Sequence, residues 1–268
     1  MRHVLAVGSG KGGVGKSTVS LNLALALTER GLRVGLLDAD LYGPNIPLMV
    51  GITRHRWTET WTLARPRESQ VRLAPVERYG LKIASAGFIL GEDQPLGVEA
   101  VTAQMLTRQL LNEVAWGDLD VLVVDLPPGT ADIQQVLLKA MPVTGALVVA
   151  TPQYVAHLDA RKAVRMYERH RVPVLGWVEN MGPMRCPHCG EPVEVFPQVP
   201  KERSLRTLGV ARLGSIPFDP ALGRAGDTGR VLLANGATGP LATAFRDLAS
   251  AVAARLAERS DGDGRAPG

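Results

Sequence analysis

A glycine-rich stretch near the start of the chain has the residue types and the spacing of a loop that binds phosphate. It lies between an apolar run at residues 4–7 and a segment from Thr18 to Arg30 whose apolar residues recur at helical spacing. Glycines let successive backbone N–H groups turn toward phosphate oxygens, and the helix that follows adds the positive end of its dipole. A ligand-free surface turn is the alternative, but the flanking strand and helix disfavour it. The residues of this predicted cofactor-binding loop are Gly10, Lys11, Gly12, Gly13, Val14, Gly15, Lys16, Ser17 and Thr18.

Three side chains of this loop carry its chemistry. Lys16 is predicted to lie along the β- and γ-phosphates of a nucleoside triphosphate as a catalytic residue, and Ser17 to offer its hydroxyl to Mg²⁺. Lys11 is not needed to cradle a nucleotide within one chain, so its simplest interpretation is a solvated charge on a flexible loop. The loop therefore predicts ATP and Mg²⁺ as cofactors.

Three aspartates follow apolar runs that are predicted to be buried strands. Asp38 and Asp40 come after residues 32–37, and Asp125 closes the run at 121–124. Ligands of open α/β sheets bind at the carboxyl ends of parallel strands, so we expect these carboxylates beside the phosphate loop. Asp38 and Asp125 are predicted to hold Mg²⁺-bound water, and Asp40 to orient the water that attacks the γ-phosphate. For Asp38 and Asp40 the alternative is a polar strand end that caps the next segment.

The segment that follows Asp125, Leu126-Pro127-Pro128-Gly129-Thr130-Ala131-Asp132, predicts a nucleotide-sensing switch. Its prolines fix the turn, and Gly129 permits a close approach of its N–H group to the γ-phosphate. A loop that contacts only this phosphate is held with ATP and released with ADP. A proline–glycine turn without function is the alternative. The base is predicted to lie near Asn180, whose amide both donates and accepts, and near Pro217 at the end of the last strand.

The only two cysteines of the chain form the motif Cys186-Pro187-His188-Cys189. Such a pair serves as half of a metal site, as a redox dithiol, or as two unrelated thiols. A redox pair normally opens a helix, and the prolines and glycine around this motif oppose one. Because a metal site needs about four ligands, two thiolates per chain predict a site shared by two chains across a two-fold axis. The motif leaves a four-thiolate zinc site and an iron–sulfur cluster equally open.

Length and composition agree with one folded unit. The chain has 268 residues, of which 46% are hydrophobic and 21% charged, as in an ordinary globular protein. Alternating strands and helices predict the α/β class: a single P-loop NTPase domain over residues 1–259, with a mainly parallel twisted sheet, helices on both faces, and a disordered tail at 260–268. No apolar run reaches the roughly 20 residues of a membrane span, and we expect no leader peptide and no membrane partner. The scattered basic residues give no case for nucleic acid, and the paired thiols suit a reducing cytoplasm.

Other elements are predicted with less chemistry attached to them. Residues 71–84 favour a hairpin, and apolar residues from Glu99 to Trp116 fit an amphipathic helix. A closing helix carries an apolar face that includes Leu241 and Leu256. The basic and aromatic loop at 53–70 has no assigned role.

The phosphate loop with its second lysine resembles the deviant loop of the ParA/MinD superfamily. This resemblance implies that Lys11 reaches across a dimer interface and stabilises charge on the partner's transferring phosphoryl group, as an arginine finger does. Further motifs occur in the order of the Mrp/ApbC family of iron–sulfur cluster carrier ATPases, which the chain resembles over roughly residues 4–258. They are the segments 38–47, 125–130, 142–146 and 178–181, followed by the cysteine motif.

The Mrp/ApbC resemblance implies a homodimer that holds a labile [4Fe–4S] cluster between paired loops, with Cys186 and Cys189 as ligands in each chain. It also implies slow ATP hydrolysis, an adenine contact from Asn180, and apo iron–sulfur proteins and scaffold proteins as partners. Two other functions stay open. A ParA/MinD-type positioning ATPase would need a basic surface patch or a basic amphipathic tail, and neither is visible in the sequence. A zinc-stapled regulatory NTPase would differ from a carrier in the metal it holds.

Overall fold

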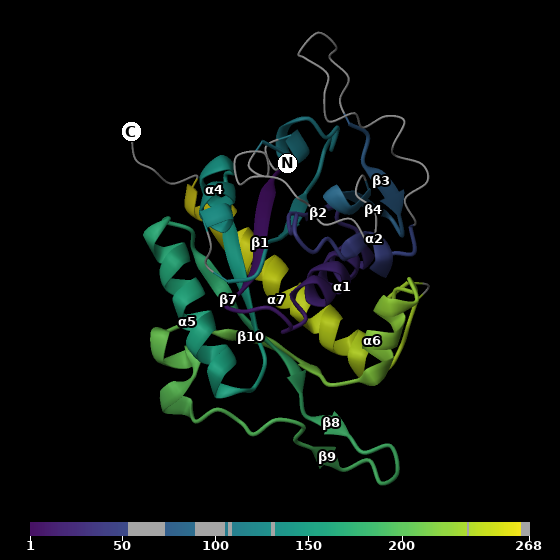
Figure 1. The fold of residues 1–268 in the computed structure, drawn as a ribbon, viewed down its shortest axis with the longest axis vertical. Helices are drawn as coiled ribbons and strands as arrows, with labels where there is room; N and C mark the ends of the chain where they lie inside the picture. Colours follow the sequence, from purple (N-terminus) through teal and green to yellow (C-terminus); the bar gives the residue numbers. More distant parts are fainter. Residues whose placement is uncertain (53–72, 89–104, 107–108, 130–131, 235, 264–268) are drawn as a thin grey trace.

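The computed structural model describes residues 1–52, 73–88, 105–106, 109–129, 132–234 and 236–263 (Figure 1). Within these residues a central sheet has the strand order β10 (Arg212–Pro217), β7 (Val174–Gly182), β6 (Gly145–Ala150), β1 (His3–Ser9), β5 (Val121–Asp125), β2 (Val34–Asp38), β4 (Leu81–Ser85) and β3 (Val76–Arg78). Every neighbouring pair is parallel except β3 and β4, which pair antiparallel at one edge. A separate two-stranded sheet is formed by β8 (Met184–Arg185) and β9 (Pro192–Val193).

Helices cover both faces of the central sheet (Figure 1). On one face α1 (Lys16–Glu29) packs against α7 (Pro240–Asp263), and the other face carries α4 (Asp132–Ala140) and α5 (Tyr154–Arg169). Because side chains alternate along a strand, Leu5 and Val7 of β1 join the α1–α7 core, whereas Val4 and Ala6 join the α4–α5 core. The shorter helices are α2 (Ile46–Met49), α6 (Pro220–Asp227) and the 3₁₀ turns η2 (Ala86–Phe88), η3 (Lys201–Arg203) and η4 (Leu205–Leu208). The predicted α/β domain with a mainly parallel sheet is confirmed.

The strand that leads toward the cysteines, β7, runs to Gly182 at its carboxyl end. β10 pairs alongside this end, with Glu179 opposite Ser215 in the register. Glu179 is buried, yet its carboxylate accepts hydrogen bonds from the Arg212 guanidinium at 2.9 Å and the Ser215 hydroxyl at 3.0 Å. A charged residue inside a strand is tolerated when its partners lie on the neighbouring strand.

Several predicted elements differ from the structure. The hairpin expected across residues 71–84 is limited to β3 and β4, and Leu73 instead forms an isolated parallel bridge with Val114. The helix expected to end at Trp116 therefore stops before Val114, and residues 99–104 and 107–108 lie outside the described part. The loop 53–70 also lies outside it. Sequence analysis did not predict α4, α6 or the β8–β9 hairpin.

The closing helix extends beyond its predicted end. α7 runs to Asp263 and so includes Ser260, where the tail was predicted to begin, while residues 264–268 lie outside the described part. Among the described residues, the membrane-span criteria of length and apolar character are met by no helix.

Candidate functional site

The phosphate loop follows β1 and leads directly into α1, which begins at Lys16. Gly13 and Gly15 have φ values of 76° and 80°, a left-handed conformation that side chains with a Cβ rarely adopt. Gly10 is required for a different reason. A Cβ at that position would lie 2.0 Å from the backbone carbonyl carbon of Asp159, so the loop passes directly beside the backbone of α5.

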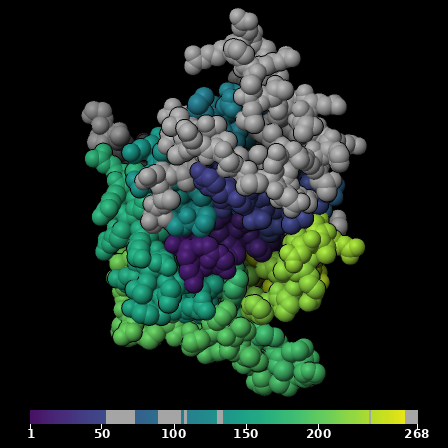
Figure 2. All heavy atoms as spheres, viewed as in Figure 1, coloured from purple at the N-terminus to yellow at the C-terminus, as the bar shows by residue number. Residues whose placement is uncertain are grey.

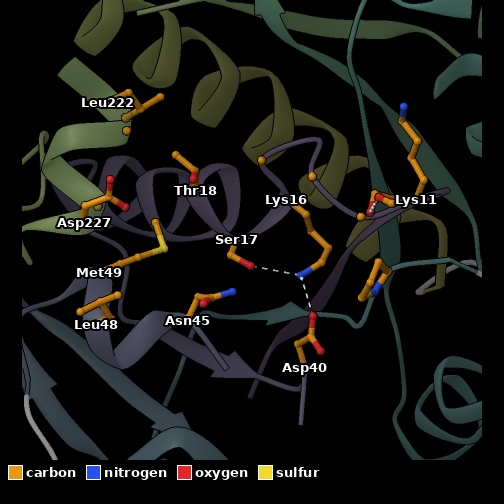
Figure 3. A pocket seen from close by; sticks show the side chains of 17 residues that line it. Lys11, Lys16, Ser17, Thr18, Asp40, Asn45, Leu48, Met49, Leu222 and Asp227 are labelled. Atoms are coloured by element: carbon orange, nitrogen blue, oxygen red, sulfur yellow. Dashed lines mark hydrogen bonds and ion pairs between the residues drawn. The ribbon is translucent and has the colours of Figure 1, made fainter. Parts of the chain in front are cut away.

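A pocket of about 300 Å³ opens over this loop (Figure 3). One wall is the loop itself, including Lys11, Lys16, Ser17 and Thr18, together with Asp40 and Pro128. The opposite wall was missed by sequence analysis and comes from the regions of α2 and α6. Its lining residues are Asn45, Leu48, Met49, Leu222, Gly223, Gly226 and Asp227. The sequence does signal α6, because Asp219 caps it by accepting the Ala221 N–H and Pro220 occupies its first turn.

Lys16, in the wall of the pocket, forms ion pairs with two aspartates. Its amine lies 2.9 Å from Asp125 Oδ1 and 3.9 Å from Asp40 Oδ2, and it donates a hydrogen bond to Ser17 Oγ at 3.2 Å. The structure therefore brings together four residues that were predicted from three separate stretches of sequence. Burial raises the pKa of the Asp40 carboxyl, and the charge of Lys16 opposes this shift.

Asp38 and Asp125 end adjacent strands and lie directly opposite each other in the register. Asp38 accepts hydrogen bonds from the Ser85 hydroxyl at 2.9 Å and from the backbone N–H of Ile46 at 3.3 Å. Burial, and then the neighbouring Asp125 carboxylate, raise the pKa of Asp38 to about 8. Asp38 is only 1% exposed and shapes the turn toward α2 from beneath the pocket, so its contact with Mg²⁺-bound water stays a prediction.

The oxygen atoms around Lys16 suit a magnesium nucleotide. Asp125 is fully buried, and while its Oδ1 accepts from the Ser20 hydroxyl at 2.7 Å, its Oδ2 has no hydrogen-bond partner among the described residues. An unpaired buried carboxylate oxygen is costly unless a further group completes it. Carboxylate and hydroxyl oxygens, here from Asp125 and Ser17, are the chemistry that Mg²⁺ prefers. The residues present thus fit the predicted cofactors.

Lys11 behaves differently from Lys16. It lies on the same loop and lines the same pocket, but its amine points away from Lys16 and Asp40 in Figure 3. The loop is held there by Ser9, whose hydroxyl donates to the Lys11 carbonyl at 2.9 Å. The two lysines of the loop therefore face different surroundings within one chain.

Asn180 contacts the phosphate loop itself. Its side-chain amide donates to the Val14 carbonyl at 2.8 Å, and a Cβ on Gly15 would lie 2.2 Å from the same nitrogen. Neither Asn180 nor Pro217 is among the described residues that line the pocket, so their contacts with the base stay predictions. Sequence analysis missed the link from Asn180 to the loop because the two are brought together only by the sheet.

The predicted switch is described in part. Pro128 lines the pocket, and Gly129 has a φ of 84° and donates its N–H to the Ser9 carbonyl at 3.1 Å. A contact from the Gly129 N–H to a γ-phosphate requires this bond to open. Thr130 and Ala131 lie outside the described residues.

The cysteine motif forms the tip of the β8–β9 hairpin, which projects from the body of the molecule (Figures 1 and 2). The Cys186 N–H donates to the Glu191 carbonyl at 2.8 Å, and the Gly190 N–H donates back to the Cys186 carbonyl at 2.9 Å. Gly190 adopts a φ of 77°, which closes this turn. The cysteine motif is thus the turn of a hairpin, with both cysteines at its end.

Both thiols are accessible and one is activated. Cys186 is half-buried and Cys189 is exposed, and neither forms a disulfide. The pKa of the Cys186 thiol is lowered by the backbone N–H of Cys189, then by that of His188 and by the Cys189 thiol. A lowered thiol pKa favours the thiolate that binds metal. Within the described residues no group of three or more metal-binding side chains comes together, at these thiols or elsewhere.

A family model described as ParA: NUBPL iron-transfer P-loop NTPase matches residues 1–253. The chain belongs to this family. The Mrp/ApbC-type relationship predicted from the motifs is confirmed, since curated relatives include an iron-sulfur cluster carrier protein of Aquifex aeolicus.

Members of the NUBPL iron-transfer family match over most of this chain. The Aquifex aeolicus protein is 42% identical over 93% of the chain, which spans 66% of that protein's length. The iron-sulfur cluster transfer protein NUBPL of Dictyostelium discoideum is 36% identical over 96% of the chain and 77% of its own length. The chain therefore spans about two thirds of the length of the first of these relatives and about three quarters of the second.

Solved structures agree on the fold. A nucleotide-binding protein from Archaeoglobus fulgidus in complex with ADP superposes with a TM-score of 0.72 at 34% identity, over 91% of each chain. The cell division ATPase MinD of Pyrococcus furiosus superposes with a TM-score of 0.67 at 23% identity, over 95% of this chain and 99% of that one. The NUBPL-family chain thus has the P-loop NTPase fold that the phosphate loop predicts.

Proposed function

We propose that this protein is an ATP-dependent carrier that holds a [4Fe–4S] cluster between two copies of the chain and transfers it to apo-proteins. Support comes from its membership of an iron-transfer family and from relatives named as cluster carrier or transfer proteins. The observation that carries the proposal is the exposed hairpin that presents Cys186 and Cys189 without further ligands from the described part of the same chain.

The cluster is the cargo of this reaction, and its ligand requirement sets the assembly. A [4Fe–4S] cluster takes four thiolates, whereas the chain contains two cysteines in all. Two hairpins facing each other across a two-fold axis supply four. The hairpin projects from the body of the molecule (Figure 1), which leaves room for the hairpin of a second copy to approach it.

The nucleotide site supplies the energy-dependent step. ATP is held by the backbone N–H groups of residues 10–18 and by the Lys16 amine, and Mg²⁺ by the Ser17 hydroxyl and water on Asp125. Bound Mg²⁺ neutralises charge on the phosphates. Asp40, at the pocket wall, orients the attacking water, and Lys11 crosses the dimer interface to the partner's nucleotide. Slow hydrolysis of ATP to ADP and phosphate is the expected reaction.

One strand connects the two sites. β7 contacts the phosphate loop through Asn180 and ends two residues later, at Gly182. The cysteine hairpin begins shortly after that residue. Met181, between them, has a φ of 57°, which is unusual for a residue with a long side chain. A movement of the phosphate loop on nucleotide exchange is therefore transmitted through Asn180 to the base of the hairpin, which changes the grip of the thiols on the cluster.

The partners and the compartment follow from this chemistry. Scaffold proteins supply the cluster and apo iron–sulfur proteins receive it. Reduced thiols are maintained in the cytoplasm, which we propose as the site of action. ATP then sets the time at which the exposed cluster is released.

Anaerobic reconstitution with iron and sulfide tests this function. We expect the broad visible absorbance of an iron–sulfur cluster, with iron far in excess of zinc in the purified protein. Transfer is measured by activation of an apo iron–sulfur enzyme in the presence and absence of ATP. Zinc alone, with no cluster absorbance after reconstitution, would replace the carrier by a zinc-stapled NTPase.

A further inference from the structure

A second cavity, of about 540 Å³, lies on the outer side of α5, away from the phosphate loop. The basic groove, as we call it, is bounded by α5, by Leu208 of η4 and by Gln135 of α4. Figure 1 shows α5 at the margin of the molecule, with the segment that contains η4 beside it. The proposed carrier chemistry uses none of these residues.

The walls of the groove are strongly cationic. No carboxylate is among the described residues that line it. Five of the lining residues are basic: Arg161, Lys162, Arg165, Arg169 and His170. The arginines recur at intervals of four along α5, so they lie one above another on the same side of the helix. In the sequence the basic residues look scattered, and the helix is what gathers them.

Local acidic residues neutralise only part of this surface. Lys162 pairs with Asp159 at 2.9 Å and Arg165 with Glu168 at 2.7 Å. Both are exposed pairs, which contribute little to stability, so a carboxylate of a partner can replace them at little cost. Among the described residues, Arg169 forms no ion pair with a carboxylate. Favourable placement at the helix C-terminus accounts for Arg169 and His170, but not for cations nearer the middle of the helix.

The Arg161 side chain is fixed by hydrogen bonds to the segment that forms the other wall of the groove. Its guanidinium donates to the Ser204 carbonyl at 3.3 Å and to the Thr207 hydroxyl. These bonds fix η4 against α5 and keep the groove open. A pre-formed cationic wall lowers the entropy cost of binding an anionic partner.

The groove also has an apolar component. Leu158, which is 40% exposed, lines the groove together with Met166 and Leu208. The phosphates of a nucleic acid make no apolar contacts of this kind. Single-stranded nucleic acid usually stacks its bases on aromatic side chains, and His170 is the only aromatic residue among the described residues that line the groove. Carboxylates flanking an apolar side chain match both components at once.

We infer that the basic groove is a docking site for an acidic segment of a partner protein, with glutamate or aspartate side chains against the arginines and a leucine-sized side chain against Leu158. The groove shares no lining residue with the cysteine hairpin or with the pocket over the phosphate loop, so variants in it can be tested without altering either site directly.

The probe is a fluorescein-labelled peptide in which glutamates alternate with leucines at helical spacing. Binding to the full chain is followed by fluorescence anisotropy at low and at physiological salt. We expect the double variant Arg165→Glu/Arg169→Glu to weaken binding at least about tenfold, because like charges across an interface repel. A peptide with serine in place of leucine should bind several-fold more weakly than the original, since it lacks the apolar contact.

A matched control reverses two arginines on α7, on the other face of the sheet, in the variant Arg255→Glu/Arg259→Glu. We expect this variant to bind the peptide as wild type does. Retained ATP binding shows that each variant is folded, and Arg165→Gln/Arg169→Gln replaces the double charge reversal if that variant does not fold. Equal peptide binding by all variants, or tighter groove-dependent binding of a thymidine oligonucleotide than of the peptide, would overturn the proposal.

Discussion

The phosphate loop and the cysteine hairpin are joined by β7, yet they are built in opposite ways. At the loop, Lys16 and Asp125 are buried, and Asp125 lies within hydrogen-bonding distance of both Lys16 and Ser20. The hairpin has two-residue strands, and Cys189 at its tip is exposed. The difference is that folding of one chain brings the side chains of the candidate nucleotide site together, whereas it leaves the two thiols at an exposed tip.

The largest expected effect is at the hairpin. Replacing Cys186 by Ala removes one of two thiolates from each chain and should abolish cluster absorbance after reconstitution. ATP binding should stay at the wild-type level, because the hairpin contributes nothing to the pocket. Both are measured on the same anaerobic sample, and cluster absorbance of wild-type intensity in the variant would disprove the role of this thiol.

At the other region, Lys16→Ala should weaken ATP binding roughly 100-fold, the loss expected for charge-assisted hydrogen bonds to phosphate. It should leave cluster absorbance intact. Affinity is measured by isothermal titration calorimetry. Lys11→Ala is the matched control, since its amine points away from Lys16 and should matter for hydrolysis in the dimer more than for binding. Equal loss of affinity in both variants would contradict the separate roles of the two lysines.

The substitution Asn180→Ala tests the contact between β7 and the phosphate loop, which lies between the two regions. Removing the bond to the Val14 carbonyl leaves a buried acceptor unpaired, which costs on the order of 1–3 kcal/mol. We expect roughly tenfold weaker binding of ATP and GTP alike, together with a smaller effect of ATP on the rate of cluster transfer. A loss confined to ATP would show instead that Asn180 contacts the adenine base.

The smallest effect concerns His157, which ties α5 to the segment after the hairpin. Its Nδ1 accepts the Leu205 N–H at 3.3 Å, and its ring packs edge-on against Trp177. Burial lowers the pKa of His157 to about 4, so the unfolded chain takes up a proton below pH 6.5 while the folded chain does not.

Stability should therefore fall as pH decreases from about 6.5 to 4, by about 1–2 kcal/mol from this residue, or a few degrees in Tm. The variant His157→Gln keeps an acceptor for Leu205 but has no group that titrates. Thermal unfolding monitored by circular dichroism at pH 7 and pH 5 should show a smaller acid-induced decrease in the variant. The same decrease in both proteins would assign the pH dependence to other groups.

Much of the nucleotide site was predictable because its residues follow local rules. The loop needs glycines at fixed positions, and carboxylates at the ends of parallel strands must meet at one edge of the sheet. The contacts of Asn180 with Val14 and of Ser85 with Asp38 were not predictable, since they join segments that only the strand order brings together.

The same reason explains the other omissions. The residues of α6 that line the pocket are brought to the loop by tertiary packing, which no local sequence motif predicts. The basic groove depends on which side of α5 faces outward and on the position of η4. Counting charges along the sequence predicts neither the outward side of α5 nor the position of η4.

The central claim is that two chains share one cluster. It is tested most directly by light scattering and by iron and sulfide analysis on the same fraction of reconstituted protein from an anaerobic size-exclusion column. The account predicts a dimer that contains about four iron atoms per two chains, as one [4Fe–4S] cluster with four thiolate ligands requires. A monomer that carries a complete cluster would contradict it.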